Sequence, residues 1–175
     1  PSRKSCKPTL NFISVGWKSL GCEYNTDHTK LSADVVGKLS ISHRASVNSP
    51  RVVIDCRSSG RHTGEWRLVH HCGEHYNTLY ELSKHDFMQS LLTEVMATIL
   101  MCEQHDCSLA TILFLCTTGT HKSTAAARLA KEAFALHGYQ TSLTHLSSGN
   151  WKARNKCFEC SYCTVGCEWK VPIFK

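Results

Sequence analysis

Four short apolar runs are spread along the chain, and each has the length of a β-strand. They are Leu10–Val15, Arg51–Cys56, Thr111–Leu115 and Thr141–Leu146. The second and third runs are almost continuously apolar, which is typical of strands covered on both faces of a sheet. The pattern therefore predicts four strands, at least two of them deeply buried.

Two segments between these runs repeat apolar residues at helical spacing. The first begins after Ser83-Lys84-His85-Asp86, which resembles a capping box, and extends to about Gln104. The second spans about His121 to Leu136, where His137-Gly138 supplies a stop signal. The buried face of the first helix is expected to comprise Phe87, Leu91, Leu92, Val95, Met96, Ile99 and Leu100. Strands that alternate with helices of this length predict an α/β fold with a mainly parallel sheet.

The remaining segments are more polar and divide the chain into two parts. Residues 23–50 are rich in Ser, Thr, Asn and His and are predicted to be a long loop insertion, and residues 57–77 are expected to be irregular. After Trp151 the composition changes to Cys, Lys and aromatic residues. A chain of 175 residues has the size of one domain with a small appendage. We therefore expect an α/β domain over 1–150 and a cysteine-rich appendage over 151–175.

Composition narrows the classes of partner. The net charge of +6 favours anionic partners such as phosphorylated metabolites, RNA or acidic protein surfaces, although an ordinary basic surface has the same charge. No apolar run is long enough to span a membrane, so no membrane partner is expected. The 11 cysteines are odd in number and several lie within apolar elements, which favours a mostly reduced, intracellular protein.

The most informative segment is the turn from the third strand into the second helix, Cys116-Thr117-Thr118-Gly119-Thr120-His121-Lys122-Ser123. Amides at the start of a helix have no acceptor within the helix, and the helix dipole places partial positive charge there. Gly119 permits a tight backbone path, four hydroxyl side chains add donors, and Lys122 adds a full charge. These groups predict a site for phosphate or a similar oxyanion. A plain turn with a threonine cap is the alternative.

Cys116 allows a catalytic interpretation. Five residues separate it from Lys122, a spacing that resembles the loop of cysteine phosphatases, in which the thiol is the nucleophile. The segments around Asp55 and Cys116 also resemble the opening strand and active loop of rhodaneses. However, Lys122 replaces the arginine that would grip a phosphoryl group at two points, and no general acid is evident. A buried cysteine at the end of a strand is therefore preferred, with a rhodanese- or phosphatase-like enzyme using Cys116 as the alternative.

Taken together, four segments resemble the C-terminal domain family of RapZ, a bacterial small-RNA adaptor. Ile13-Ser14-Val15-Gly16-Trp17-Lys18 looks like the family's opening strand, and Val53-Ile54-Asp55-Cys56-Arg57 looks like its second strand. The loop 116–123 looks like its Cys-Thr-Gly-Gly loop, and Thr144-His145 looks like its closing His-Arg-Asp segment. The resemblance covers roughly residues 10–150. Lys122 in place of Arg, Ser58-Ser59 after the second strand and Leu146-Ser147 after His145 depart from the family pattern.

The resemblance implies a three-layer α/β domain with helices on both faces of the sheet, which binds RNA, senses an amino-sugar phosphate and acts as an adaptor rather than a catalyst. Protein partners or homo-oligomers are compatible with that role. The residues carried over to the ligand site are Lys18, Asp55, Arg57, Thr117, Thr118, Gly119, Thr120, His121, Lys122, Ser123 and His145. They would converge at the carboxyl ends of the strands, where open α/β sheets bind ligands. We expect a non-catalytic module that binds a phosphorylated ligand, most favourably RNA and otherwise a sugar phosphate.

The appendage contains a separate cluster, Cys157, Cys160, Cys163 and Cys167. Four thiolates could hold a structural zinc ion, which would stabilise this short segment. Cys6, Cys72 or His75 could replace one ligand, and an Fe–S cluster, disulfides or free thiols are the alternatives. Aromatic and basic residues interleave around the cysteines, which suits stacking on single-stranded RNA. Docking on the domain is the preferred role for Trp151 and Trp169.

Overall fold

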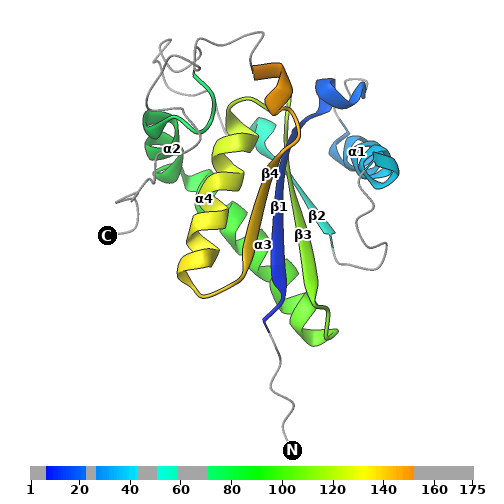
Figure 1. The fold of residues 1–175 in the computed structure, drawn as a ribbon, viewed down its shortest axis with the longest axis vertical. Coiled ribbons are helices and arrows are strands. Elements are labelled where there is room, and N and C mark those ends of the chain that lie inside the picture. The colour runs from blue at the N-terminus through cyan, green and yellow to red at the C-terminus, as the bar shows by residue number, and fades with distance from the viewer. Residues whose placement is uncertain (1–6, 23–26, 43–50, 59–70, 152–175) are drawn as a thin grey trace, which may run out of the picture.

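The computed structural model describes residues 7–22, 27–42, 51–58 and 71–151, and these form a parallel β-sheet flanked by helices (Figure 1). The strands are β1 (Thr9–Gly16), β2 (Arg51–Asp55), β3 (Leu109–Cys116) and β4 (Thr141–His145), in the order β2-β3-β1-β4. All three pairings are parallel. The four apolar runs are therefore the four strands of this sheet, as predicted.

Helices cover both faces of the sheet, which gives the three layers of an α/β fold (Figure 1). On one face lies α1 (His28–Ser42), and on the other lie α2 (Tyr76–Ser83), α3 (Asp86–Gln104) and α4 (Lys122–Leu136). Short 3-10 turns follow three of the strands: η1 (Trp17–Leu20), η2 (Cys56–Ser58) and η4 (Ser148–Asn150).

The central strand β3 explains why its sequence is continuously apolar. Ile112 and Phe114 pack in the core beneath α2, α3 and α4, whereas Leu113 and Leu115 pack in the core beneath α1. Successive side chains of a strand point to opposite faces, so a strand between two helical layers needs apolar residues at every position.

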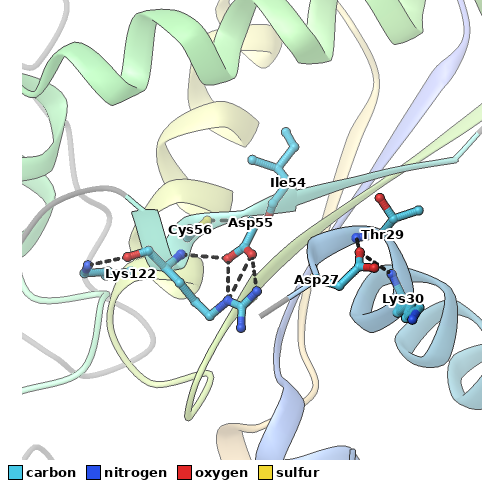
Figure 2. A network of polar contacts seen from close by, with 8 residues as sticks. Asp27, Thr29, Lys30, Ile54, Asp55, Cys56 and Lys122 are labelled. Atoms are coloured by element: carbon cyan, nitrogen blue, oxygen red, sulfur yellow. Dashed lines mark hydrogen bonds and ion pairs between the residues drawn. The ribbon is translucent and has the colours of Figure 1, made fainter. Parts of the chain in front are cut away.

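The prediction of a long loop over 23–50 is wrong, because this segment contains α1. Asp27 begins the helix: its carboxylate accepts hydrogen bonds from the amides of Thr29 (2.9 Å) and Lys30 (3.2 Å), as Figure 2 shows. Among the side chains of α1 that the structure describes, Val35 and Leu39 are buried against the sheet. Polar residues interrupt the apolar period of this serine-rich segment, so sequence analysis did not find the helix.

The prediction of irregular structure up to 77 and the predicted capping box also need correction. The helix α2 begins at Tyr76, and α3 begins at Asp86 after His85 rather than after Ser83. In both helices a histidine is the N-cap: Nδ1 of His75 accepts from the Asn77 amide, and Nδ1 of His85 accepts from the Phe87 amide. A neutral imidazole can accept such a bond, although it is not among the preferred capping residues.

The buried face of α3 differs from the prediction, because Met88, Thr98 and Cys102 are also buried. Leu91, Val95 and Ile99 are buried as expected, but Met96 and Leu100 are exposed. Residues 152–175 lie outside the described residues, whereas Trp151 is buried against the domain, as preferred from its sequence. Among the described residues, no helix has both the length and the apolar character needed to cross a membrane.

Candidate functional site

The parallel sheet brings the sequence-predicted site residues to one edge. Because all strands point the same way, their carboxyl ends meet there. The register pairs Gly16 with Cys116 and Asp55 with Leu115. Four segments follow at this edge: Lys18 after β1, Asp55 and Arg57 at the end of β2, residues 116–123 after β3, and His145 at the end of β4.

The neighbouring strands β1 and β3 define the centre of this edge. The chain leaving β1 continues to α1 on one face of the sheet, whereas the chain leaving β3 continues to α4 on the other face (Figure 1). In open α/β sheets, ligands bind where neighbouring strands send their connections to opposite faces. The loop 116–123 follows β3 at that point.

Close packing against the end of β1 holds the loop in place. A Cβ atom at Gly16 would lie 2.2 Å from the carbonyl carbon of Thr118, so only glycine allows this approach. Gly119 has a φ of +69°, and a Cβ there would lie 2.3 Å from the Ser147 hydroxyl. That hydroxyl accepts a hydrogen bond from the Gly16 amide at 3.0 Å. The loop, β1 and the segment after β4 therefore form one packed unit.

Neighbouring protein groups bond three backbone carbonyls of the loop, those of Thr117, Gly119 and Thr120. The donors are the Lys18 amide to Thr117 (3.3 Å), the Thr124 hydroxyl (3.0 Å) and Trp151 indole (3.1 Å) to Gly119, and the Gly73 amide to Thr120 (2.7 Å). In a trans peptide the carbonyl and the next amide point in opposite directions. The amides of Thr118, Thr120 and His121 therefore point away from these donors.

The loop thereby presents hydrogen-bond donors rather than acceptors. Within the described part of the chain, the amides of Thr118 and Thr120 have no acceptor. The first turn of α4 begins directly afterwards, at Lys122, and adds the partial positive charge of a helix N-terminus. Such an arrangement is suited to an oxyanion.

Cys116 lies beneath the loop and is only 5% exposed. Its Sγ accepts a hydrogen bond from the Gly119 amide at 3.1 Å and lies 3.1 Å from Oγ of Ser123, which is fully buried. The sulfur thus connects the end of β3 to the loop and to the first turn of α4.

The charged side chains near the loop form an ordered group at the end of β2 (Figure 2). Nζ of Lys122 donates to the backbone oxygen of Arg57 at 3.3 Å. The Arg57 guanidinium is held by the Asp55 carboxylate, with Nη2 2.7 Å from Oδ2 and Nε 3.0 Å from Oδ1. Asp55 therefore orients Arg57. Lys18 contributes its backbone amide, while its ammonium group lies 5.5 Å from the ring centroid of Trp17.

His145 belongs to a polar cluster beside the loop. Its Nδ1 lies 2.6 Å from Oγ of Ser14, and its Nε2 lies 2.8 Å from Oε1 of Glu74. Glu74 also faces Arg128 at 3.5 Å, and the Trp151 ring packs on the imidazole with centroids 5.3 Å apart. Ser14, Glu74 and Trp151 therefore fix the orientation of the His145 ring, and Arg128 pairs with Glu74. Sequence analysis did not identify Glu74 or Arg128 as part of this cluster.

The predicted metal ligands Cys157, Cys160, Cys163 and Cys167 lie outside the described residues. Among residues that the structure describes, no group of three His, Cys, Asp or Glu side chains is arranged to hold a metal ion. Of the possible substitute ligands, Cys6 lies outside the described residues, whereas Cys72 and His75 lie just before α2; the rings of His71 and His75 are 4.1 Å apart. Burial, together with the charge of His71, lowers the pKa of His75.

Several residues that support the loop were not predicted as part of the site, among them Gly16, Gly73 and Ser147. Each comes from a segment distant in sequence, and a Cβ on Gly73 would lie 2.3 Å from the His121 carbonyl oxygen. The sequence alone does not show which backbone segment packs against a given glycine. No protein-family model matches this chain, and no curated protein matches it significantly.

Proposed function

We propose that this chain is a non-catalytic binding module that recognises a phosphorylated ligand through the loop 116–123. RNA is the favoured ligand class, and a sugar phosphate is the next. The orientation of the loop peptides carries the proposal, because the surrounding protein bonds the carbonyls of Thr117, Gly119 and Thr120, and the amides of Thr118 and Thr120 point away from those partners. A phosphate group supplies several acceptor oxygens for such donors.

Charge supports the same ligand class. Lys122 lies at the first position of α4, and the whole chain carries a net charge of +6. A lysine near backbone donors acts as a point charge toward phosphate, whereas the guanidinium of Arg57 is already paired with Asp55. The resemblance of residues 10–150 to the RapZ C-terminal family adds RNA and an amino-sugar phosphate as specific candidates.

The test compares Lys122→Ala with Lys131→Ala, since both remove one lysine from the same helix. Lys131 lies on the third turn of α4 and bonds Glu132 at 3.0 Å, away from the loop. Binding of a labelled, single-stranded RNA of mixed sequence is measured by fluorescence anisotropy over a range of salt concentrations. Lys122→Ala should weaken binding and lower the slope of log K against log salt by about 1.

The outcomes separate the ligand classes. Competition by inorganic phosphate alone identifies a phosphate site, and stronger competition by an amino-sugar phosphate identifies the small molecule as the preferred ligand. Equal affinities and equal salt slopes for Lys122→Ala and Lys131→Ala would contradict the proposal, provided that both variants melt like the parent protein.

A Cys116-dependent enzyme is the second candidate, because the Gly119 amide and the Ser123 hydroxyl both lie at hydrogen-bond distance from Sγ. Those donors would support an anionic sulfur as well as a buried thiol. Iodoacetamide modification of Cys116 across pH, followed by mass spectrometry, distinguishes the two. Rapid modification near neutral pH favours the enzyme, and an inert thiol favours the binding module.

A further inference from the structure

Two buried cysteines lie where the neighbouring strands β2 and β3 end. Cys116 is the last residue of β3, and Cys56 directly follows the last residue of β2. The register pairs Asp55 of β2 with Leu115 of β3, and the residues that directly follow this pair are Cys56 and Cys116. Neighbouring strands run about 4.8 Å apart, and a disulfide needs Cα atoms within roughly 4.4–6.8 Å.

Both side chains also point to the same face of the sheet. Ile54 and Phe114 are paired in the register and belong to the core beneath α2, α3 and α4, and Cys56 and Cys116 belong to that same core. Figure 2 shows Cys56 at the end of β2, where its Sγ lies 3.7 Å from the Ile54 carbonyl oxygen. Neither cysteine is in a disulfide in this structure.

The electrostatics agree with this proximity. Complete burial raises the pKa of Cys56 well above its usual value, and negative charge on Cys116 is the next largest cause. Cys56 therefore stays protonated at neutral pH. Cys116 is the more accessible of the two, at 5% exposure against 0%.

We propose that Cys116 and Cys56 form an oxidation site, in which hydrogen peroxide converts the two neighbouring thiols to an intramolecular disulfide. The Cys116 sulfur attacks one peroxide oxygen, the O–O bond breaks, and the thiol proton passes to the departing hydroxide, so that one water molecule leaves and a sulfenic acid forms on Cys116. The Cys56 sulfur then attacks Sγ of Cys116 as its proton moves to the departing hydroxyl group, so that one water molecule is released. Peroxide is reduced and the two thiols are oxidised by two electrons.

This disulfide would switch off the loop, a consequence that rests on the proposed function. Sγ of Cys116 now accepts from the Gly119 amide and contacts the Ser123 hydroxyl. A bond to Cys56 draws the sulfur toward β2 and weakens it as an acceptor, so the loop loses its link between β3 and α4. Oxidised protein should therefore lose phosphate or RNA affinity, and dithiothreitol should restore it.

The experiment treats the full chain with hydrogen peroxide, blocks the remaining thiols with N-ethylmaleimide and maps disulfides by tryptic mass spectrometry. The expected product joins peptide 52–57, which contains Cys56, to peptide 85–122, which contains Cys116. Fragmentation must place the bond on Cys116 rather than on Cys102 or Cys107, which share that peptide. Failure to find this bond, or its placement on Cys102 or Cys107, would overturn the proposal.

Two variants sharpen the test. Cys56→Ala should abolish the disulfide and leave a sulfenic acid on Cys116 that dimedone traps. Cys102→Ala changes a fully buried cysteine of the same core and should leave the disulfide intact. Melting curves of both variants serve as the control for folding. The two proposals fail separately: if reduced protein does not bind phosphate or RNA, the proposed function is refuted, whereas an oxidised, disulfide-linked protein that still binds refutes the switch.

Discussion

Replacing Gly16 with alanine tests whether the loop 116–123 is seated on the end of β1. The added Cβ would lie 2.2 Å from the Thr118 carbonyl carbon and 2.5 Å from the Gly119 nitrogen and the Thr118 oxygen. Ordinary van der Waals contact begins near 3.4 Å, and all three atoms are backbone, so no flexible side chain can move aside. Gly16 has a φ of −99°, so alanine introduces no backbone strain, and the steric clash is the destabilising effect.

The magnitude follows from the cost of inserting a methyl group into a packed region, which is about 1–3 kcal/mol and sometimes more. Because only backbone atoms surround the new group, we expect the free energy of unfolding to fall by about 3 kcal/mol. Gly37→Ala is the matched control. It lies within α1, where an added Cβ has no neighbour within 4 Å, so the variant should gain about 0.5–1 kcal/mol from helix propensity.

Urea unfolding, followed by far-ultraviolet circular dichroism, measures both variants under identical conditions. Gly16→Ala should unfold at lower urea concentration than the parent protein, and Gly37→Ala should unfold at the same or higher concentration. RNA binding of folded Gly16→Ala should also weaken, since the loop must move to accommodate the methyl group. An unchanged midpoint for Gly16→Ala would show that the loop does not lie on β1.

Two further predictions concern pH and metal. The pKa of His75 is lower in the folded protein than in the unfolded chain, where it is near 6.5. As the pH falls, the unfolded chain therefore binds a proton first. The contribution of His75 to the free energy of unfolding is complete above about pH 6.5 and decreases as pH falls below it. His75→Asn keeps a capping side chain and removes the titration, so urea midpoints measured at about pH 7.5 and about pH 5.5 should differ less than in the parent protein. From the spacing of Cys157, Cys160, Cys163 and Cys167, elemental analysis should find zinc, and a chelator should lower the melting temperature. A pH dependence unchanged in His75→Asn would refute the prediction for His75, and native protein without zinc would refute the prediction of a metal site.

The strands could be predicted from sequence because a strand buried on both faces of the sheet is almost continuously apolar. The run Thr111–Leu115 has no polar residue after its first position, and the structure places it at the centre of the sheet. In contrast, α1 has its described core contacts at Val35 and Leu39, and its start depends on Asp27. Helices that bury few side chains are specified by capping and by tertiary contact more than by hydrophobic period.

The position of the loop could be predicted, but its chemistry in detail could not. A strand followed by Gly119 and Lys122 before a helix is enough to predict donors at a helix start. Which way each peptide faces depends on partners such as the Gly73 amide and the Trp151 indole, which are remote in sequence. The direction of Lys122 toward the Arg57 carbonyl likewise depends on the strand order, which places β2 beside β3.

These contacts hold the loop in one arrangement, which matters for the binding proposed above. The ends of the strands each supply a contact: Gly16 from β1, the Arg57 carbonyl after β2, Cys116 from β3 and Ser147 after β4. A donor set that is already ordered loses little conformational entropy when a ligand arrives. Charge and packing should then act separately, because removing the Lys122 ammonium changes affinity and its salt dependence, whereas Gly16→Ala changes stability and affinity together. A loop that becomes ordered only with ligand would instead tolerate the Gly16 substitution in the free protein.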